Sequence, residues 1–304
     1  MSPTLPKSYK AAVIEEANGK LNIKDLPLKE PEHGQILVKV KACGVCHSDE
    51  AVRTGAFGQP PIVPGHEVIG SVVALGDGEK KWKVGDLVDA EYVLLRTEAA
   101  VRIPEGMDVV KAAPLLCAGV TVFNAMRNMK VTAGGVVAIQ GLGGLGHLAV
   151  QYSRKMGYRT VALSRDGSKK DFAMKLGATD YVDGSKENTA EALQKLGGAD
   201  LVVVTAPNPS IMGDLVNGCA AGGTVVILAP VGEITVNTIP MILKGISVRG
   251  WPSGHALDSE EAIAFAQTHG VECMVEEFPL SKANEAMEHM MSGKVRFRAV
   301  LKME

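Results

Sequence analysis

The segment VVAIQGLGGLGHLAV, residues 136–150, limits the possible folds of this 304-residue chain more than any other feature. Gly141, Gly143 and Gly146 stand in G-x-G-x-x-G spacing, after an apolar run and before a helical pattern. In that context the first glycine permits a tight turn, the second lets the backbone approach a pyrophosphate, and the third lets helix and strand pack closely. The segment therefore predicts a dinucleotide-binding turn that comprises Gly141, Gly143, Gly144, Leu145 and Gly146.

Short apolar runs alternate with helical patterns on the C-terminal side of this turn. RTVALS (159–164), ADLVVVTA (199–206) and GGTVVILA (222–229) are separated by helix-like segments. Strands that alternate with helices indicate βαβ units and a parallel sheet covered on both faces. We therefore predict an α/β protein with a doubly wound, parallel-sheet Rossmann domain over residues 118–253.

The two ends of the chain have a different pattern, rich in β-branched residues. YKAAVIE, QILVKVKACGV and HEVIGSVVALG are separated by Gly, Pro and Asp signals, and helical pattern is scarce before about residue 110. After residue 253 the chain has two helix candidates (259–270 and 282–293) and a last strand. These patterns predict a β-rich catalytic domain built from residues 1–117 and 254–304, with the Rossmann domain inserted between them.

The end of the second Rossmann strand bears on the choice of cofactor. An NAD-binding domain usually has Asp or Glu there, which accepts hydrogen bonds from the ribose 2′-hydroxyl. Ser164 occupies that place, followed by Arg165, with Lys169 nearby. Because no carboxylate would repel a 2′-phosphate and Arg165 can pair with one, NADP(H) is favoured over NAD(H). The competing candidate for the ribose is Asp166, two residues late.

Three separate motifs carry side chains that bind metals. GVCHSDE contains Cys46, PGHE contains His66 and LLCAG contains Cys117. Two thiolates and an imidazole suit Zn²⁺, and three protein ligands leave the fourth position open, as in catalytic zinc sites. A redox pair of Cys43 and Cys46 is the alternative interpretation of the CxxC spacing.

Composition narrows the class of protein further. The formal net charge is −2 and 46% of the residues are hydrophobic, which does not fit a nucleic-acid-binding surface. No apolar run reaches the length of a membrane span, and the N-terminus lacks the apolar core of a signal peptide. Five cysteines, an odd number, fit reduced thiols better than a disulfide scaffold. We therefore expect a cytoplasmic protein that binds neither nucleic acid nor membrane.

The motifs together resemble those of the zinc-dependent medium-chain alcohol dehydrogenases, and most of all the microbial and cinnamyl-type members with CHSD. GVCHSD, PGHE, VGD, AEYV, LCAG, GLGGLGH and KLGATDYVD occur in the family's order, over nearly the whole chain. The resemblance implies a GroES-like catalytic domain beside the Rossmann domain. It also implies that hydride transfer with a nicotinamide cofactor interconverts alcohols and aldehydes or ketones. Family members pair their sheets through the strand that matches GISVRGW, so a homo-oligomer, dimer or tetramer, is expected.

The resemblance also implies roles for individual residues. Cys46, His66 and Cys117 match the catalytic zinc ligands, which makes Cys43 a packed thiol rather than half of a dithiol.

Five further positions match residues around the family's zinc and cofactor. Glu67 matches a carboxylate that can replace water on the metal, and Asp49 matches one that orients the ligand histidine. Ser48 matches the hydroxyl that takes the alcohol proton. His47 and Arg298 match positions near the cofactor pyrophosphate.

Two departures from the family pattern stand out. Ala51 replaces a histidine that ends the proton relay in many members, so the proton must leave by the ribose hydroxyl, His47 or water. The larger departure is KVGDLVDAEYVLLR, where most members carry a lobe with four cysteines and a structural zinc. A short Val88–Asp89–Ala90 junction replaces it, which predicts one catalytic zinc per chain and no structural zinc. An aromatic pocket residue is lost with the lobe, and Phe57 is left as a possible wall.

Two other functions stay open at this point. A zinc-independent reductase of the quinone or enoyl type has the same fold; relatives without the lobe include the quinone branch, and they generally lack the catalytic zinc ligands as well. A protein that lost the lobe and is nearly inactive, or that only binds the cofactor, is the second alternative. The complete set of Cys46, His66 and Cys117 argues against the zinc-independent reductase and against a protein that only binds the cofactor, whereas the nearly inactive protein stays open.

Overall fold

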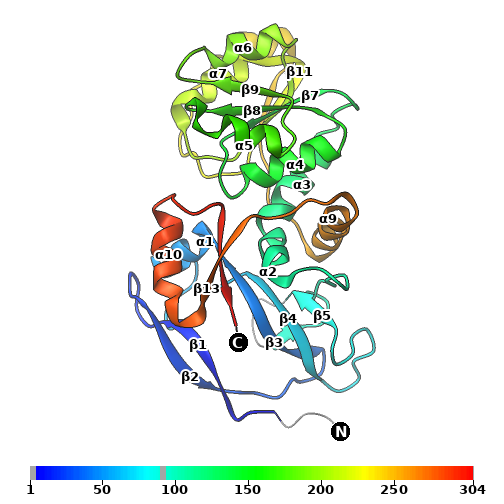
Figure 1. Cartoon of the computed structure of the whole chain (residues 1–304), viewed down its shortest axis with the longest axis vertical. Coiled ribbons are helices and arrows are strands. Elements are labelled where there is room, and N and C mark those ends of the chain that lie inside the picture. The colour runs from blue at the N-terminus through cyan, green and yellow to red at the C-terminus, as the bar shows by residue number, and fades with distance from the viewer. Residues whose placement is uncertain (1–4, 90–93, 304) are drawn as a thin grey trace. The chain divides into compact units, whose positions relative to one another are not determined.

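The computed structural model describes residues 5–89 and 94–303, which form two compact units (Figure 1). The β-rich domain contains the described residues up to Cys117, together with His255–Thr268 and those from Glu272 onward. The Rossmann domain contains Ala118–Gly254 and His269–Val271. Ala90 of the predicted junction and residues 91–93 of the AEYV motif lie outside the described residues.

The Rossmann domain is built on a six-stranded parallel sheet. In spatial order its strands are β12 (Ser247–Gly250), β11 (Cys219–Ile227), β10 (Ala199–Val204), β7 (Val136–Gln140), β8 (Arg159–Ser164) and β9 (Asp180–Asp183). The chain runs outward from β7 to β9, crosses back to β10, and runs outward again to β12. Since right-handed crossovers place the helices of the two halves on opposite faces, the sheet is doubly wound, and its central strands β7 and β10 are mostly apolar.

Helices connect these strands and bury the sheet. They are α3 (Ala118–Asn128), α4 (Gly146–Lys155), α5 (Lys170–Lys175), α6 (Thr189–Lys195), α7 (Met212–Asn217) and α8 (Thr238–Lys244), with 3₁₀ turns η2 (Gly167–Lys169) and η3 (Pro209–Ile211). Val137, Ile139, Val202 and Val204 on the central strands are fully buried. The order β10-β7 at the centre marks the point where the chain changes direction, and ligands of such sheets bind at the carboxyl ends of the strands there.

The β-rich domain contains one large sheet and one small one. The large sheet has the order β13 (Val275–Pro279), β14 (Arg298–Lys302), β3 (Gln35–Val45), β4 (Glu67–Leu75) and β5 (Leu87–Asp89), and β6 (Leu94–Arg96) also pairs with β3. β1 (Ser8–Ile14) and β2 (Leu21–Pro27) form an antiparallel pair. Its helices are α1 (His47–Arg53), α2 (Val109–Ala112), α9 (Ala256–His269) and α10 (Ala283–Met291), with the turns η1 (Ala113–Leu116) and η4 (Leu280–Lys282).

The long strand β3 is the main support of the site. It pairs antiparallel with β4 on one side and β14 on the other, so that Gly44 lies opposite both Glu67 and Val300. The sequence analysis predicted β3, β4 and β14, but it did not anticipate α1, α8 or β13. α1 follows β3 after a single residue, Cys46, and therefore brings the CHSD motif directly to the end of the central strand.

Within the described ranges, no single helix has the length and apolar character of a membrane span. One bent pair, Val109–Leu116 with Ala118–Asn128, passes that test only when its two parts are taken together.

Candidate active site

Cys46 lies between strand β3 and helix α1, where the chain changes direction. Its backbone N–H donates to Asp49 Oδ2 at 2.8 Å, so the Asp49 carboxylate closes the first turn of α1. Asp49 is 3% exposed. A carboxylate at a helix start is favourable because it faces the positive end of the helix dipole. The local sequence thereby holds the backbone of Cys46 at the start of α1.

His66 is oriented by the second oxygen of the same carboxylate. Its Nδ1 lies 3.0 Å from Asp49 Oδ1. An ionised carboxylate only accepts hydrogen bonds, so Nδ1 carries the proton and the lone pair belongs to Nε2. Nε2 is buried and has no hydrogen-bond partner among the described residues. A buried acceptor without a partner is costly, and a metal ion at Nε2 would remove that cost.

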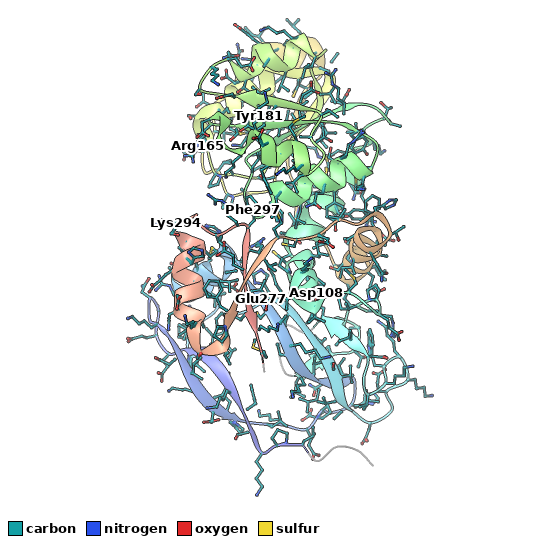
Figure 2. The ribbon with its side chains drawn as sticks, viewed as in Figure 1. Asp108, Arg165, Tyr181, Glu277, Lys294 and Phe297 are labelled. Carbon is teal, nitrogen blue, oxygen red and sulfur yellow. The ribbon has the colours of Figure 1, made fainter. Side chains whose placement is uncertain are left out.

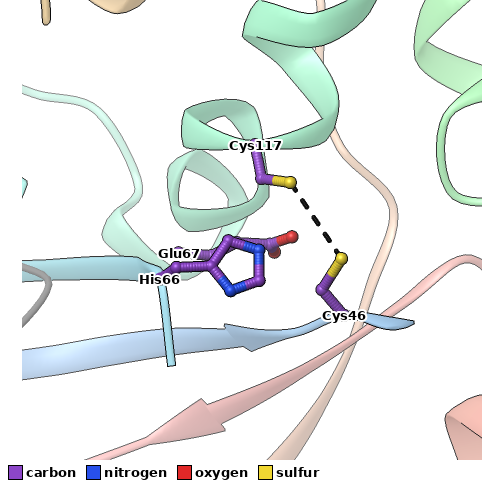
Figure 3. A group of neighbouring side chains, drawn as sticks. All are labelled: Cys46, His66, Glu67 and Cys117. Carbon is purple, nitrogen blue, oxygen red and sulfur yellow. Dashed lines mark hydrogen bonds between the residues drawn. The ribbon is translucent and has the colours of Figure 1, made fainter. Parts of the chain in front are cut away.

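Cys117 follows the turn η1 and completes a compact cluster with Cys46, His66 and Glu67 (Figure 3). The two sulfur atoms are 4.0 Å apart. The four potential ligand atoms all lie within 4.8 Å of one another. Two sulfurs and an imidazole nitrogen are the donor set of a catalytic zinc site. The residues present therefore fit a zinc ion.

The hydrogen bond between the two thiols shifts their pKa values in opposite directions. The hydrogen bond from Cys117 lowers the pKa of Cys46 well below its usual value, helped by Arg298 and His66 and despite burial. The same hydrogen bond and burial raise the pKa of Cys117. Burial alone would lower the pKa of His66, but the hydrogen bond to Asp49 and the nearby Cys46 thiol raise it to about 11. A metal ion would compete with these protons, because thiolates and neutral imidazole are the forms that bind it.

A buried ion pair lies beside the cluster. Arg298 Nη1 is 3.4 Å from Glu67 Oε1, and the two side chains are 4% and 0% exposed. Burial is the main reason that the pKa of Glu67 is raised, to about 8, while Arg298 acts against the shift. The contact between Arg298 and a cofactor pyrophosphate stays a prediction, whereas its pairing with Glu67 was not anticipated.

Gly44 makes room for this carboxylate. A Cβ atom built on Gly44 would lie 1.9 Å from Glu67 Oε2 and 2.9 Å from Glu67 Cβ. Any side chain at position 44 would therefore displace Glu67. The sequence analysis missed this role because it depends on the β3–β4 register, which places the two residues opposite each other.

The predicted proton-transfer residues lie on α1. Ser48 Oγ is 3.8 Å from Cys46 Sγ, and both Ser48 and His47 are exposed. Phe57, in the segment after α1, is 61% exposed. The exposure of these three residues is consistent with a cluster that solvent can reach. Their roles stay predictions.

The glycine-rich turn of the Rossmann domain joins β7 to α4. Gly141 has φ +91°, and a Cβ there would lie 2.7 Å from the Cβ of Ala206. A Cβ at Gly146 would lie 1.9 Å from the Gly141 oxygen, which shows why strand and helix require glycine there. Gly143 is exposed with no atom near its Cβ position. Helix α4 has no side-chain cap, and the His147 amide in its first turn donates to the Gly143 carbonyl oxygen at 3.0 Å.

The residues predicted to bind the ribose follow strand β8. Ser164 ends the strand, and Arg165 is exposed directly after it. Lys169 Nζ donates to the carbonyl oxygen of Leu142 at 2.8 Å, which connects this segment to the glycine-rich turn. Asp166 Oδ1 accepts a hydrogen bond from the backbone N–H of Ser168 at 2.9 Å, so this carboxylate caps η2.

A Rossmann domain with an exposed glycine-rich turn and a β-rich domain with a cysteine–histidine cluster together indicate an oxidoreductase. The family described as zinc-binding dehydrogenase matches residues 144–273, and the alcohol dehydrogenase GroES-like domain matches residues 32–108. The chain belongs to the zinc-type alcohol dehydrogenase family and is an oxidoreductase.

Individual relatives agree with this assignment. The chain is 50% identical to alcohol dehydrogenase patD of Penicillium expansum over 340 residues, covering 100% of both chains. It is 41% identical to alcohol dehydrogenase notN of an Aspergillus species over 338 residues, covering 99% and 100%. Among solved structures, a cinnamyl alcohol dehydrogenase from Sorghum bicolor superposes with a TM-score of 0.88 at 26% identity, covering 97% and 98%. The predicted family and fold class are thus confirmed.

Proposed function

We propose that the protein is a zinc-dependent alcohol dehydrogenase that interconverts alcohols and aldehydes or ketones with a nicotinamide cofactor. One observation carries the proposal. His66 Nε2 is buried, has no hydrogen-bond partner among the described residues, and lies within 4.8 Å of the Cys46 and Cys117 sulfur atoms. Asp49 already holds the imidazole in the tautomer that a metal requires.

The residues of the site have separable tasks in this reaction. Cys46, His66 and Cys117 would hold a zinc ion, which acts as a Lewis acid on the substrate oxygen. Ser48 would accept the hydroxyl proton and His47, also exposed on α1, would pass it to water. A nicotinamide cofactor held at the glycine-rich turn would supply the hydride acceptor for the carbinol carbon.

We propose one zinc per chain and no structural zinc. The alignment with the Penicillium relative spans 340 positions and covers all of this 304-residue chain. At least 36 positions of the relative therefore have no counterpart here, which agrees with a missing lobe. Among the described residues, the cluster at Cys46 is the one group found with metal-ligand geometry.

We further propose NADP(H) as the favoured cofactor. Arg165 is exposed at the strand end, and Ser164 stands where an NAD-binding domain usually has a carboxylate. An arginine and a phosphate form a strong, charge-assisted pair. Asp166 is the nearest competing carboxylate, and one of its oxygens is already used by the Ser168 amide.

The partners we propose are a small alcohol, aldehyde or ketone and a second copy of the chain. β12 lies at the edge of the Rossmann sheet. Beside it in sequence, α8 exposes Ile239, Ile242 and Leu243 by 63%, 79% and 79%. Apolar side chains gathered beside a sheet edge favour association, so we expect a homo-oligomer rather than a monomer.

The test combines metal analysis with an aldehyde-reduction assay that uses NADPH. We expect one zinc per chain, and loss of both zinc and activity in Cys46→Ser. Cys219→Ser is the matched control, because Cys219 is a buried thiol in the Rossmann domain, far from the cluster in sequence. Full activity in zinc-free protein, or in Cys46→Ser, would indicate a zinc-independent reductase. A protein that binds zinc and NADPH but reduces no aldehyde or ketone would indicate the nearly inactive alternative.

A further inference from the structure

The loop of residues 164–169, called here the β8 loop, carries the residues proposed to select the cofactor. Arg165 is exposed, and Figure 2 labels it in the Rossmann domain together with Tyr181. A free arginine side chain loses about 2 kcal/mol of rotamer entropy when it is fixed. Recognition of a phosphate by Arg165 is therefore stronger if the backbone beneath it is already held in place.

Strand β9 and the residue after it hold the β8 loop on both sides of Arg165. The backbone N–H of Gly184 donates to the carbonyl oxygen of Ser164 at 2.9 Å. The Tyr181 hydroxyl donates to the carbonyl oxygen of Asp166 at 2.5 Å. The residue before Arg165 is thus fixed by a backbone hydrogen bond, and the residue after it by a side chain.

The neighbouring carboxylates contribute to the same arrangement. Asp166 Oδ1 accepts from the Ser168 amide at 2.9 Å, and Asp183 Oδ1 accepts from the Ser185 amide at 3.0 Å. Each acidic group thereby binds the backbone of its own turn.

The Lys169 ammonium group is held at the glycine-rich turn by Leu142. Arg165 is the exposed cation of the loop. Its side chain can reach an incoming anion by rotating about its own bonds, without movement of the backbone.

We propose that Tyr181 is a positioning residue for recognition of the 2′-phosphate. Its hydroxyl fixes the Asp166 carbonyl and so presents Arg165 to the phosphate without contacting the phosphate itself. This inference rests on the proposed preference for NADP(H). It assigns a part in cofactor selection to strand β9, which the glycine motif and the strand end of β8 do not include.

The test measures binding of two fragments, adenosine 2′,5′-bisphosphate and 5′-AMP, to the full-length protein by calorimetry. Tyr181→Phe removes one hydroxyl. We expect it to weaken the bisphosphate about three- to tenfold, the range for one net hydrogen bond, and 5′-AMP by less than about twofold. Tyr158→Phe is the matched control, because Tyr158 precedes the amino end of β8. It should change neither affinity, and thermal unfolding of both variants checks their folding.

A second background separates positioning from direct contact. If Tyr181 acts through Arg165, adding Tyr181→Phe to Arg165→Leu causes no further loss of bisphosphate affinity. An equal loss in both backgrounds would overturn the inference, as would an unchanged preference in Tyr181→Phe. If the unmodified protein does not prefer the bisphosphate, the proposed NADP(H) selectivity fails, and the inference fails with it for that separate reason.

Discussion

The cluster of potential metal ligands and the glycine-rich turn are both candidate sites for a charged group, but they are built in opposite ways. The cluster takes Cys46, His66 and Cys117 from three separate segments and buries Cys46 and the Nε2 atom of His66. The turn uses consecutive residues and leaves Gly143 exposed, with no atom near its Cβ position. A contiguous motif can be recognised from spacing, whereas an assembled one depends on strand register and on neighbours that the sequence does not bring together.

The largest expected effect is a loss of zinc affinity that leaves cofactor affinity unchanged. His66→Ala removes a proposed zinc ligand, so we expect zinc affinity to fall by more than about 100-fold, beyond the loss known for outer partners of such ligands. NADPH affinity should stay within about twofold, because the glycine-rich turn belongs to the other domain. Zinc competition with a chelator and fluorescence titration of NADPH measure the two quantities. A parallel fall in NADPH affinity would show that the sites are coupled.

The next effect tests how the cluster is held together. Asp49→Asn keeps the size of the side chain but offers one acceptor oxygen where Cys46 N–H and His66 Nδ1 now use two. We expect zinc affinity to fall about 10- to 100-fold. Glu50→Gln, the neighbouring acid that pairs with Arg53, is the control and should leave zinc affinity unchanged. If both variants bind zinc equally well, Asp49 does not orient the histidine.

Two glycine substitutions make the contrast between the sites sharper. Gly44→Ala places a methyl group against the buried Glu67 carboxylate and should lower the free energy of unfolding by about 1–3 kcal/mol. Gly143→Ala meets no atom within 4 Å and should change stability by less than about 0.5 kcal/mol while weakening NADPH binding. Urea unfolding and NADPH titration of both variants are the measurements. Equal stability of the two variants would contradict the packing argument at Gly44.

The smallest expected effect concerns an ion pair at the amino ends of β8 and β9, at the other end of β8 from the proposed cofactor site. Arg159 binds Asp180 through two hydrogen bonds of 2.9 and 3.0 Å and lowers the pKa of that carboxyl. The pair therefore stabilises the fold above the usual pKa of Asp, and this contribution is lost as the pH falls through the lowered value. Asp180→Asn should cost less than about 1 kcal/mol at pH 7, because the pair is partly exposed, and nothing in strong acid. A cost that grows on acidification would reverse the assigned sign.

The sequence predicted the parts of the fold that have regular periods. Alternating strands and helices gave the Rossmann domain, and the β-branched runs gave β3 and β4. Helix α1 was missed because Cys46 is not a usual N-cap residue, and the capping carboxylate, Asp49, stands inside the helix.

The candidate site was accessible from sequence only as a set of residues. The resemblance supplied Cys46, His66 and Cys117, but not the pairing of Glu67 with Arg298 or the space left by Gly44. Both features arise where β3, β4 and β14 meet, and pairing across strands is decided by register. The role proposed for Tyr181 was missed for the same reason, since it joins two neighbouring strands.

The double use of Asp49 has a consequence for the order in which the site forms during folding. Its contact with the Cys46 amide spans three residues, whereas its contact with His66 spans 17. Local contacts close faster than distant ones, so we expect the carboxylate to be in place before β4 pairs with β3 and delivers the histidine. In pulsed hydrogen exchange the Cys46 amide should then become protected earlier than the amides of β4. Simultaneous protection would mean that the ligand set forms in one step together with the sheet.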